Sequence, residues 1–167
     1  MDPVVRPIAL ADIASHRACL DAVGRERLWL AFVEAPPLPE VAAFVSRHLD
    51  GTQPMTVAVA GDQVVGWCDI TRAERPIHTH KGIMGMGLLP EFRGRGLGRR
   101  LLAETLAGAR QAGFRRIELT VRATNAPGIA LYLALGFTEE GRLRDDFRLD
   151  GHVDDTLIMG LLFDGTS

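Results

Sequence analysis

A segment rich in glycine and arginine, residues 88–100, is the part of the sequence best suited to chemistry. It reads Leu-Leu-Pro-Glu-Phe-Arg-Gly-Arg-Gly-Leu-Gly-Arg-Arg. Glycines at 94, 96 and 98 would let an anion approach the main chain without a side chain in the way. Where such a loop opens a helix, the first amide N–H groups lack acceptors within the helix and can bind the anion. The segment therefore predicts a phosphate-binding loop, with charge supplied by Arg93, Arg95, Arg99 and Arg100.

The elements on either side of the loop fit this prediction. An apolar run at residues 83–89 predicts the strand before it, and a helical stripe over residues 96–112 predicts the helix after it, with Gly113 as its stop. The other predicted elements are a strand at 4–10, helices at 11–25 and 40–49, a hairpin of strands 55–60 and 63–71 around Gly61-Asp62, a strand at 116–121, a helix from Asn125 to Leu135, and a final hairpin around Asp150-Gly151. This order predicts a single α/β domain over residues 1–167 with a mixed sheet, not a doubly wound one.

Composition narrows the class of protein. The 167 residues suit one domain, and 47% hydrophobic and 24% charged residues are ordinary for a soluble globular protein. A net charge of -2 predicts no nucleic-acid or membrane partner. The first seven residues lack a secretory pattern, and no apolar run has the length of a bilayer. Cys19 and Cys68 have no disulfide or zinc spacing, so we expect a cytoplasmic protein without a metal.

Two common phosphate loops do not fit the spacing. A P-loop needs Gly-Lys-Ser/Thr at the start of the helix, and here Gly98 is followed by Arg99. A dinucleotide-binding GxGxxG motif that starts at Gly94 would need a glycine at position 99. The pattern that fits is Arg-x-x-Gly-x-Gly, formed by Arg93, Gly96 and Gly98. With this motif the sequence resembles the GNAT superfamily of N-acetyltransferases.

A second segment strengthens the resemblance. Asn125, Gly128, Tyr132 and Gly136-Phe137 match the superfamily pattern Asn-x-x-Ala/Gly-x-x-x-Tyr-x-x-x-Gly-Phe and follow a predicted strand, as in that family. The resemblance covers residues 55–159 and is greatest to small amino-acid N-acetyltransferases. It implies a mostly antiparallel twisted sheet, flanked by helices, with a V-shaped splay between two parallel strands. Homodimers are common in the family, so pairing through the last hairpin is one expected assembly.

The resemblance implies a binding site for acetyl-CoA. Main-chain amides of the glycine-rich loop would hold the pyrophosphate, and the strand before the loop would pair with the pantetheine arm. The residues implied in cofactor binding are Leu88, Leu89, Arg93, Gly94, Arg95, Gly96, Leu97, Gly98, Arg99, Asn125 and Tyr132. The acceptor would be a small-molecule amine.

Transfer of the acetyl group requires attack by a neutral amine, stabilisation of an oxyanion and protonation of the leaving thiolate. A backbone N–H near Leu88 is the candidate oxyanion donor, and Tyr132, the only tyrosine of the chain, is the candidate general acid. Many relatives place a glutamate on the strand equivalent to residues 83–89, but this sequence has none there. The base would then be water or, in falling order of preference, His80, His78, Glu118 or Asp69.

The acceptor site is expected between the N-terminal helices and the last hairpin. Acidic and aromatic side chains there would suit an amine: Trp29, Phe32, Glu34, Asp145, Asp146, Phe147, Asp154 and Asp155. Basic side chains could bind the carboxylate of an amino acid: Arg142, Arg144 and Arg148. A small amine or amino acid is the first choice, and a protein N-terminus, a lysine or an antibiotic are alternatives. A non-catalytic acyl-CoA-binding module, or a nucleotide-binding or redox domain on another α/β fold, also stays open.

The proposed general acid gives a first test. Tyr132→Phe removes the phenol proton and keeps the ring, so we expect normal folding and a loss of turnover of about 10²-fold. Thiol release from acetyl-CoA measures turnover, and circular dichroism checks the fold. Unchanged turnover at neutral pH would remove Tyr132 from the mechanism.

Overall fold

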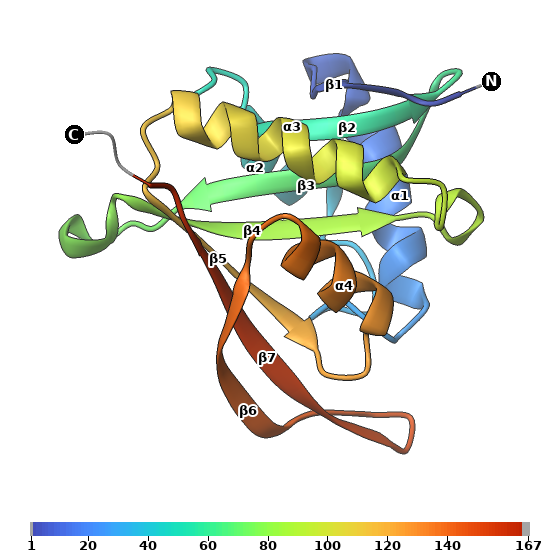
Figure 1. Ribbon diagram of the computed structural model, residues 1–167. Helices are drawn as coiled ribbons and strands as arrows, with labels where there is room; N and C mark the ends of the chain where they lie inside the picture. The colour runs from blue at the N-terminus through green and yellow to red at the C-terminus, as the bar shows by residue number, and fades with distance from the viewer. Residues whose placement is uncertain (1, 165–167) are drawn as a thin grey trace. The chain divides into compact units, whose positions relative to one another are not determined.

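The computed structural model describes residues 2–164, which divide into two compact units (Figure 1). Unit 1 holds the chain up to Thr71 together with Met84–Gly113. Unit 2 holds Arg72–Ile83 and the chain from Phe114 onwards. The single domain expected over residues 1–167 stays a prediction.

The elements follow the expected order. The helices are α1 (Ile13–Arg25), α2 (Leu38–Ser46), α3 (Leu97–Gln111) and α4 (Ala126–Ala134), with short 3₁₀ turns η1 (Leu10–Asp12), η2 (Pro76–His78) and η3 (Pro90–Phe92). The strands are β1 (Val4–Pro7), β2 (Met55–Ala60), β3 (Gln63–Arg72), β4 (Lys81–Leu88), β5 (Arg116–Arg122), β6 (Thr138–Leu149) and β7 (His152–Leu162). No helix among residues 2–164 combines the length and the apolar character needed to cross a membrane.

Seven strands hydrogen-bond in the order β1-β2-β3-β4-β5-β7-β6. The pairs β1–β2, β2–β3, β5–β7 and β6–β7 are antiparallel, whereas β4 and β5 are parallel. The parallel register runs only from Lys81↔Arg116 to Ile83↔Glu118. The mixed, mostly antiparallel sheet flanked by helices is therefore confirmed.

Alternation along β2 and β3 separates two layers in unit 1. One face carries Met55, Val57 and Trp67, which form a core with residues of α1 and α2: Cys19, Val23, Val41 and Val45. On the other face, Thr105 of α3 hydrogen-bonds Thr56 at 2.9 Å between their hydroxyl oxygens. Successive side chains of a strand point to opposite faces, so this segregation follows from the sequence pattern.

Several boundaries differ from the prediction, and three of them are at β1, α2 and β4. β1 ends at Pro7 rather than at residue 10, because the Asp12 carboxylate accepts the Ala9 N–H at 2.8 Å and forms a turn. α2 begins at Leu38, two residues early, because proline fits the first turn of a helix, where its missing N–H is not needed. β4 begins at Lys81 rather than at residue 83.

Two glycines of β4 allow large side chains of β3 to lie flat against that strand. A Cβ at Gly87 would stand 2.3 Å from Cη2 of Trp67, and a Cβ at Gly85 would stand 3.3 Å from Oδ2 of Asp69. Real Cβ atoms do not approach as closely as 2.3 Å, so the Trp67 ring occupies the place of the missing side chain at position 87. Gly85 and Gly87 therefore allow the close approach of side chains from β3.

Gly87→Ala tests this contact. The added methyl group collides with the Trp67 ring, and we expect a loss of unfolding free energy of about 1–3 kcal/mol, the usual cost of overpacking a core. Chemical denaturation followed by tryptophan fluorescence measures the loss. Gly141→Ala is the matched control, because a Cβ there meets only Cδ1 of Ile158 at 3.7 Å. Equal stability of the two variants would contradict the packing described for Trp67.

Candidate functional site

The glycine-rich loop connects the end of β4 to the start of α3 and presents an open backbone. Gly94 and Gly96 have positive φ angles of 74° and 79°, and a Cβ on either would meet nothing within 4 Å. The first helical hydrogen bond runs from the Arg100 N–H to the Gly96 carbonyl at 3.2 Å. The preceding amides of the helix have no acceptor within it, and they carry the positive end of the helix dipole. The loop thus has the geometry of an anion site.

Arg93 holds the loop in place rather than adding charge to the anion site. Its guanidinium donates to both carboxylate oxygens of Glu26, at 2.6 and 2.9 Å, and its Nε donates to the Leu88 carbonyl at 2.9 Å. Its own amide donates to the Pro90 carbonyl at 3.2 Å. Both the guanidinium and the amide of Arg93, which were expected to bind an anion, are therefore hydrogen-bonded within the protein. The open part of the loop starts at Gly94.

At the end of β4, the backbone N–H groups of Leu88 and Leu89 differ in their direction relative to β3. The Leu89 N–H donates to the Val65 carbonyl of β3 at 2.9 Å, and the Leu89 carbonyl accepts the Phe92 N–H at 3.0 Å. The Leu89 N–H is therefore already paired within the sheet, and the predicted pairing of this backbone with a pantetheine arm stays a prediction. Successive N–H groups in a strand point to opposite sides, so the Leu88 N–H is directed away from β3. The role of the Leu88 N–H as oxyanion donor stays a prediction.

A cleft of about 430 Å³ lies in unit 1 between α1, α2 and strands β3 and β4, and we call it the α1–α2 cleft. Its walls include six apolar side chains: Leu20, Leu30, Phe32, Val41, Phe44 and Met86. Its polar lining consists mainly of His16 and Asp69, which are buried, and Glu40 and Arg47, which are exposed. Gly85 of β4 lies beside Asp69 in this lining, so the cleft reaches the strand that leads to the glycine-rich loop.

The wall formed by residues 26–37 is anchored to α1. The Ala35 N–H donates to the Asp21 carboxylate at 2.8 Å, and Nε of Arg17 donates to the Pro36 carbonyl at 2.8 Å. A Cβ at Gly24 would meet the Phe32 ring at 3.2 Å, so this aromatic packs closely on the helix. Of the three residues predicted here for the acceptor site, Phe32 lines the cleft, whereas Glu34 is exposed and pairs with Arg25 at 3.6 Å.

Asp69 is the most perturbed acid of the cleft. Its residue is 9% exposed, and burial raises the pKa of its carboxyl to about 7, although a hydrogen bond from Trp67 acts in the opposite direction. His16 is 2% exposed and packs edge-on against Trp67 with ring centroids 5.5 Å apart. Burial lowers the pKa of His16 to about 4, so its ring is neutral at pH 7. A carboxyl group that titrates near neutrality can accept and release protons during turnover.

Asn125 and Tyr132, the two residues of the second motif that are implied in cofactor binding, lie in unit 2. Asn125 caps α4, where its side-chain oxygen accepts the Gly128 N–H at 3.1 Å. Tyr132 is buried on α4, with its ring 6.0 Å from that of Phe137 in an edge-to-face arrangement. The Asn-x-x-Gly spacing of the motif thus has a local cause in the helix cap, and the cofactor contacts of both residues stay predictions.

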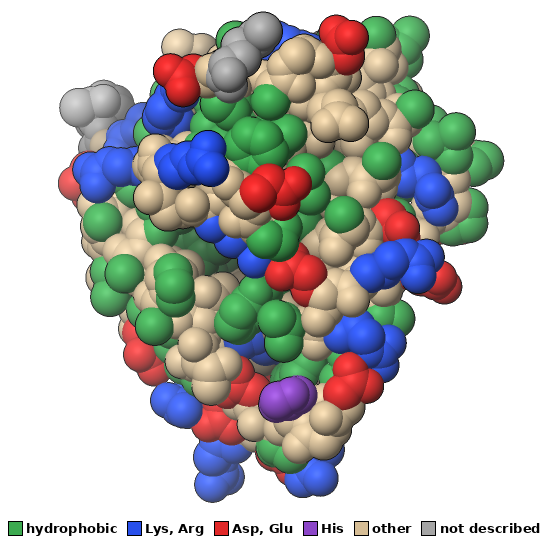
Figure 2. All heavy atoms as spheres, turned by 90° about the vertical axis from the view of Figure 1, so that its right-hand side faces the viewer, with side chains coloured by type: hydrophobic (Ala, Val, Ile, Leu, Met, Phe, Trp, Pro, Cys, Tyr) green, Lys and Arg blue, Asp and Glu red, His purple; other side chains and the backbone are tan. Residues whose placement is uncertain are grey.

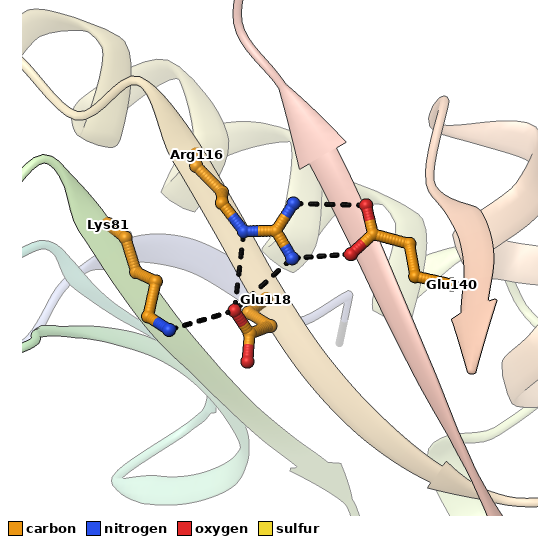
Figure 3. Close-up of polar contacts among 4 residues, drawn as sticks. All are labelled: Lys81, Arg116, Glu118 and Glu140. Atoms are coloured by element: carbon orange, nitrogen blue, oxygen red, sulfur yellow. Dashed lines mark hydrogen bonds and ion pairs between the residues drawn. The ribbon is translucent and has the colours of Figure 1, made fainter. Parts of the chain in front are cut away.

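Glu118, one of the four residues considered as base, is occupied by cations. Figure 3 shows its carboxylate between Lys81, with Nζ at 3.2 Å, and Arg116, with Nη2 at 3.2 Å. Arg116 also binds Glu140 through both ends of its guanidinium. The Glu118 carboxylate is therefore engaged in ion pairs within the protein. His78 and His80, the first choices from the sequence, lie on and next to η2 in unit 2, whereas the α1–α2 cleft belongs to unit 1.

The charged side chains of the last hairpin pair largely with one another. Asp145 binds Arg148 and Asp155 binds Arg142, each at 2.6 Å. Two further acids of the hairpin have partners outside it. Asp146 lies 3.7 Å from Arg122 of β5, and Asp154 accepts the Thr124 hydroxyl at 2.6 Å. Phe147 packs against the Arg122 guanidinium. These contacts account for most of the residues predicted to bind an acceptor from this side.

Asp69, Trp67 and His16 are the site residues that sequence reasoning undervalued. A signal was present in two neighbouring strands: Trp67 and Asp69 alternate on β3, and Gly85 and Gly87 alternate on β4. Large residues on one strand beside glycines on the next indicate that the large side chains lie over the bare backbone.

Surface charge agrees with the small net charge of the chain. Figure 2 views the molecule from the side at which β4 ends and α3 begins in Figure 1, and there Lys and Arg side chains are interspersed with Asp and Glu. Arg95 and Arg99 are exposed beside the glycine-rich loop. Positive charge for an anion at this loop would therefore come from Arg95 and Arg99 and not from the net charge of the chain.

A glycine-rich loop that leaves a strand and opens a helix, beside a largely apolar cleft, defines an α/β protein built to bind a phosphate-bearing ligand. The sequence profile of the acetyltransferase (GNAT) family matches residues 23–137, and the chain belongs to this family. This membership excludes the nucleotide-binding or redox domain on another α/β fold.

Individual relatives agree with the family. The chain is 36% identical over 94 residues to a protein of Mycobacterium tuberculosis named N-alpha-acetyltransferase RimI, covering 56% of this chain and 58% of the relative. It is 42% identical over 72 residues to the [ribosomal protein bS18]-alanine N-acetyltransferase of Salmonella typhimurium, covering 43% of this chain and 49% of the relative. The match thus spans only about half the length of these curated relatives.

Solved structures extend the similarity to the whole fold. A phosphinothricin acetyltransferase from Sinorhizobium meliloti, in complex with AcCoA, has a TM-score of 0.89 at 25% identity. The superposition covers 99% of this chain and 91% of that protein.

The raised pKa of Asp69 predicts how stability depends on pH. An unfolded aspartate has a pKa of about 3.9, so the folded state favours the protonated form. The stability contribution is fully present below about pH 4 and is lost as pH rises through about 7. Asp69→Asn keeps the neutral shape, and its melting temperature should exceed that of the wild type by more at pH 8 than at pH 4. The gain in free energy is on the order of 4 kcal/mol at most, at 1.36 kcal/mol per pKa unit. Scanning calorimetry at both pH values measures it, and a difference independent of pH would contradict the assignment.

Proposed function

We propose that this protein transfers the acetyl group of acetyl-CoA directly to a primary amine, and that the acceptor is a small molecule bound in the α1–α2 cleft. The single observation that carries the proposal is the glycine-rich loop before α3, where a Cβ at Gly94 or Gly96 would meet nothing within 4 Å. A diphosphate needs several convergent donors and room for its oxygens, and the bare backbone at Gly94 and Gly96 supplies both.

The residues of unit 1 divide the work of acyl transfer. The loop amides, with Arg95 and Arg99 nearby, would bind the pyrophosphate of acetyl-CoA. The Leu88 N–H, which is directed away from β3, would donate to the oxyanion that forms on the thioester carbonyl. Tyr132 stays the candidate acid for the leaving thiolate, as the sequence motif implies. Direct transfer needs no acyl-enzyme. Cys68 is also poorly suited to form one, because its thiol is buried and burial raises the pKa of the thiol far above neutrality.

A protein N-terminus is the second candidate acceptor. It is favoured by the names of two relatives, an N-alpha-acetyltransferase and a ribosomal-protein alanine N-acetyltransferase. The small-molecule acceptor is supported by the anchored wall of residues 26–37, which helps to bound a cleft of about 430 Å³, and by the relative named for phosphinothricin. A screen of amino acids, amines and an alanine-terminated peptide for thiol release distinguishes the two.

Gly96→Asp tests the phosphate site. The new carboxylate adds negative charge where the helix N-terminus would meet the pyrophosphate, and we expect the affinity for acetyl-CoA to fall at least about tenfold, equivalent to 1.4 kcal/mol. Isothermal titration calorimetry measures the affinity. Gly61→Asp is the matched control: Gly61 also has a positive φ of 60° and open space around it, but lies in the turn between β2 and β3.

Two outcomes would overturn the proposal. Equal affinity for acetyl-CoA in the two aspartate variants would show that the loop does not bind the pyrophosphate. Binding of acetyl-CoA without thiol release for any acceptor of the screen would instead indicate the non-catalytic acyl-CoA-binding module.

A further inference from the structure

The α1–α2 cleft contains one buried acid, and it stands at the edge nearest to the cofactor strand. Asp69 points from β3 toward β4, where its Oδ2 would lie 3.3 Å from a Cβ at Gly85. The titratable or charged groups that share the cleft are His16 on α1 and Glu40 and Arg47 on α2. Glu40 and Arg47 are exposed, and His16 is neutral at pH 7. Asp69 is therefore the one carboxylate in the cleft that is shielded from water.

The position of Asp69 along β4 suits a role in the reaction. Gly85, beside which it lies, precedes Leu88 by three residues, or about 10 Å of strand. Leu88 carries the proposed oxyanion donor, and the glycine-rich loop follows directly. An amine held by Asp69 would thus approach the acetyl group along the strand that holds the cofactor.

The missing strand glutamate has a structural replacement. β4 has a glycine at position 85, and the carboxylate that lies against this bare backbone comes from the neighbouring strand. A side chain on β3 can therefore fill the place that a side chain of β4 would otherwise occupy.

We propose that Asp69 is the catalytic base that accepts a proton from the acceptor, and that the acceptor is a primary amine carried on an apolar body. This inference rests on the proposed function. The apolar body follows from the six apolar side chains of the cleft, which would leave a second buried charge without a partner. A carboxylate on the acceptor could be accommodated only at the rim, near Arg47.

The proton balance is complete with the groups named. The ammonium of the acceptor gives one proton to the Asp69 carboxylate, and the nitrogen lone pair then forms the N–C bond to the thioester carbonyl carbon. The C–S bond breaks as the carbonyl re-forms, and the electron pair leaves with sulfur. The acid of the proposed function protonates the thiolate to CoA thiol, and the second proton of the nitrogen restores that acid. Asp69 then releases its proton to solvent.

The test compares two acceptors that differ in basicity. 2-Phenylethylamine is an ammonium ion at pH 7, whereas O-benzylhydroxylamine has a similar body and a nitrogen that is already neutral. With 2-phenylethylamine, Asp69→Asn should lower kcat/KM by about 10²-fold or more, and the rise of wild-type kcat/KM through about pH 7 should disappear. With O-benzylhydroxylamine, the same variant should keep most of its turnover, because no proton has to be removed before attack.

Matched controls separate the role of Asp69 from the fold and from the proposed function. Asp62→Asn, an exposed aspartate in the turn before β3, should leave both activities unchanged. Calorimetry should show equal affinity for acetyl-CoA in both variants. Wild-type turnover with spermidine and glycine should fall at least tenfold below that with 2-phenylethylamine, since neither has an apolar body.

The results that would overturn the inference differ from those that would overturn the proposed function. Full turnover of Asp69→Asn with 2-phenylethylamine removes Asp69 as base, and an equal loss with both acceptors makes its role structural. Spermidine or glycine as the better acceptor rejects the apolar body. A wild-type protein that binds no acetyl-CoA, or releases no thiol with any amine, refutes the proposed function itself.

Discussion

A bare backbone at Gly85 and Gly87 lets two side chains of β3 lie directly against β4, and the site of unit 1 depends on this close approach. The Trp67 ring takes the place of a side chain at position 87, and it belongs both to the core and to the lining of the cleft. Next to it, the Asp69 carboxylate is brought from the protein interior to the strand that leads to the phosphate loop. A side chain at position 87 would collide with the Trp67 ring, and one at position 85 would crowd the Asp69 carboxylate.

The burial that makes Asp69 useful also opposes folding. A carboxylate removed from water, with only a tryptophan hydrogen bond to stabilise its charge, favours its protonated form. A protein selected only for stability would neutralise such a group with a cation, as Arg116 of unit 2 does for Glu118 and Glu140. The contrast between the two units separates a carboxylate that can exchange protons from carboxylates that hold strands together.

Local sequence predicted the glycine-rich loop and the helix that follows it, but it did not predict the α1–α2 cleft. The order Arg93, Gly96, Gly98 and the helix that follows are contiguous, so their spacing alone determines where the main-chain donors stand. The cleft depends on contacts between distant segments, such as that of Asp21 with Ala35. The low rank given to Asp69 had the same cause, since its value depends on the glycine that faces it from another strand. The role of Arg93 could not be anticipated either, because Glu26 lies 67 residues away.

The ion pair between Glu26 and Arg93 has a mechanical consequence. Glu26 follows the last turn of α1 and begins the segment that walls the acceptor cleft, whereas Arg93 begins the loop that would receive the diphosphate. The Arg93 guanidinium thus connects the segment that follows α1 to the glycine-rich loop. By thermodynamic reciprocity, any effect that binding at one of these segments has on the affinity of the other through this ion pair is equal to the reverse effect.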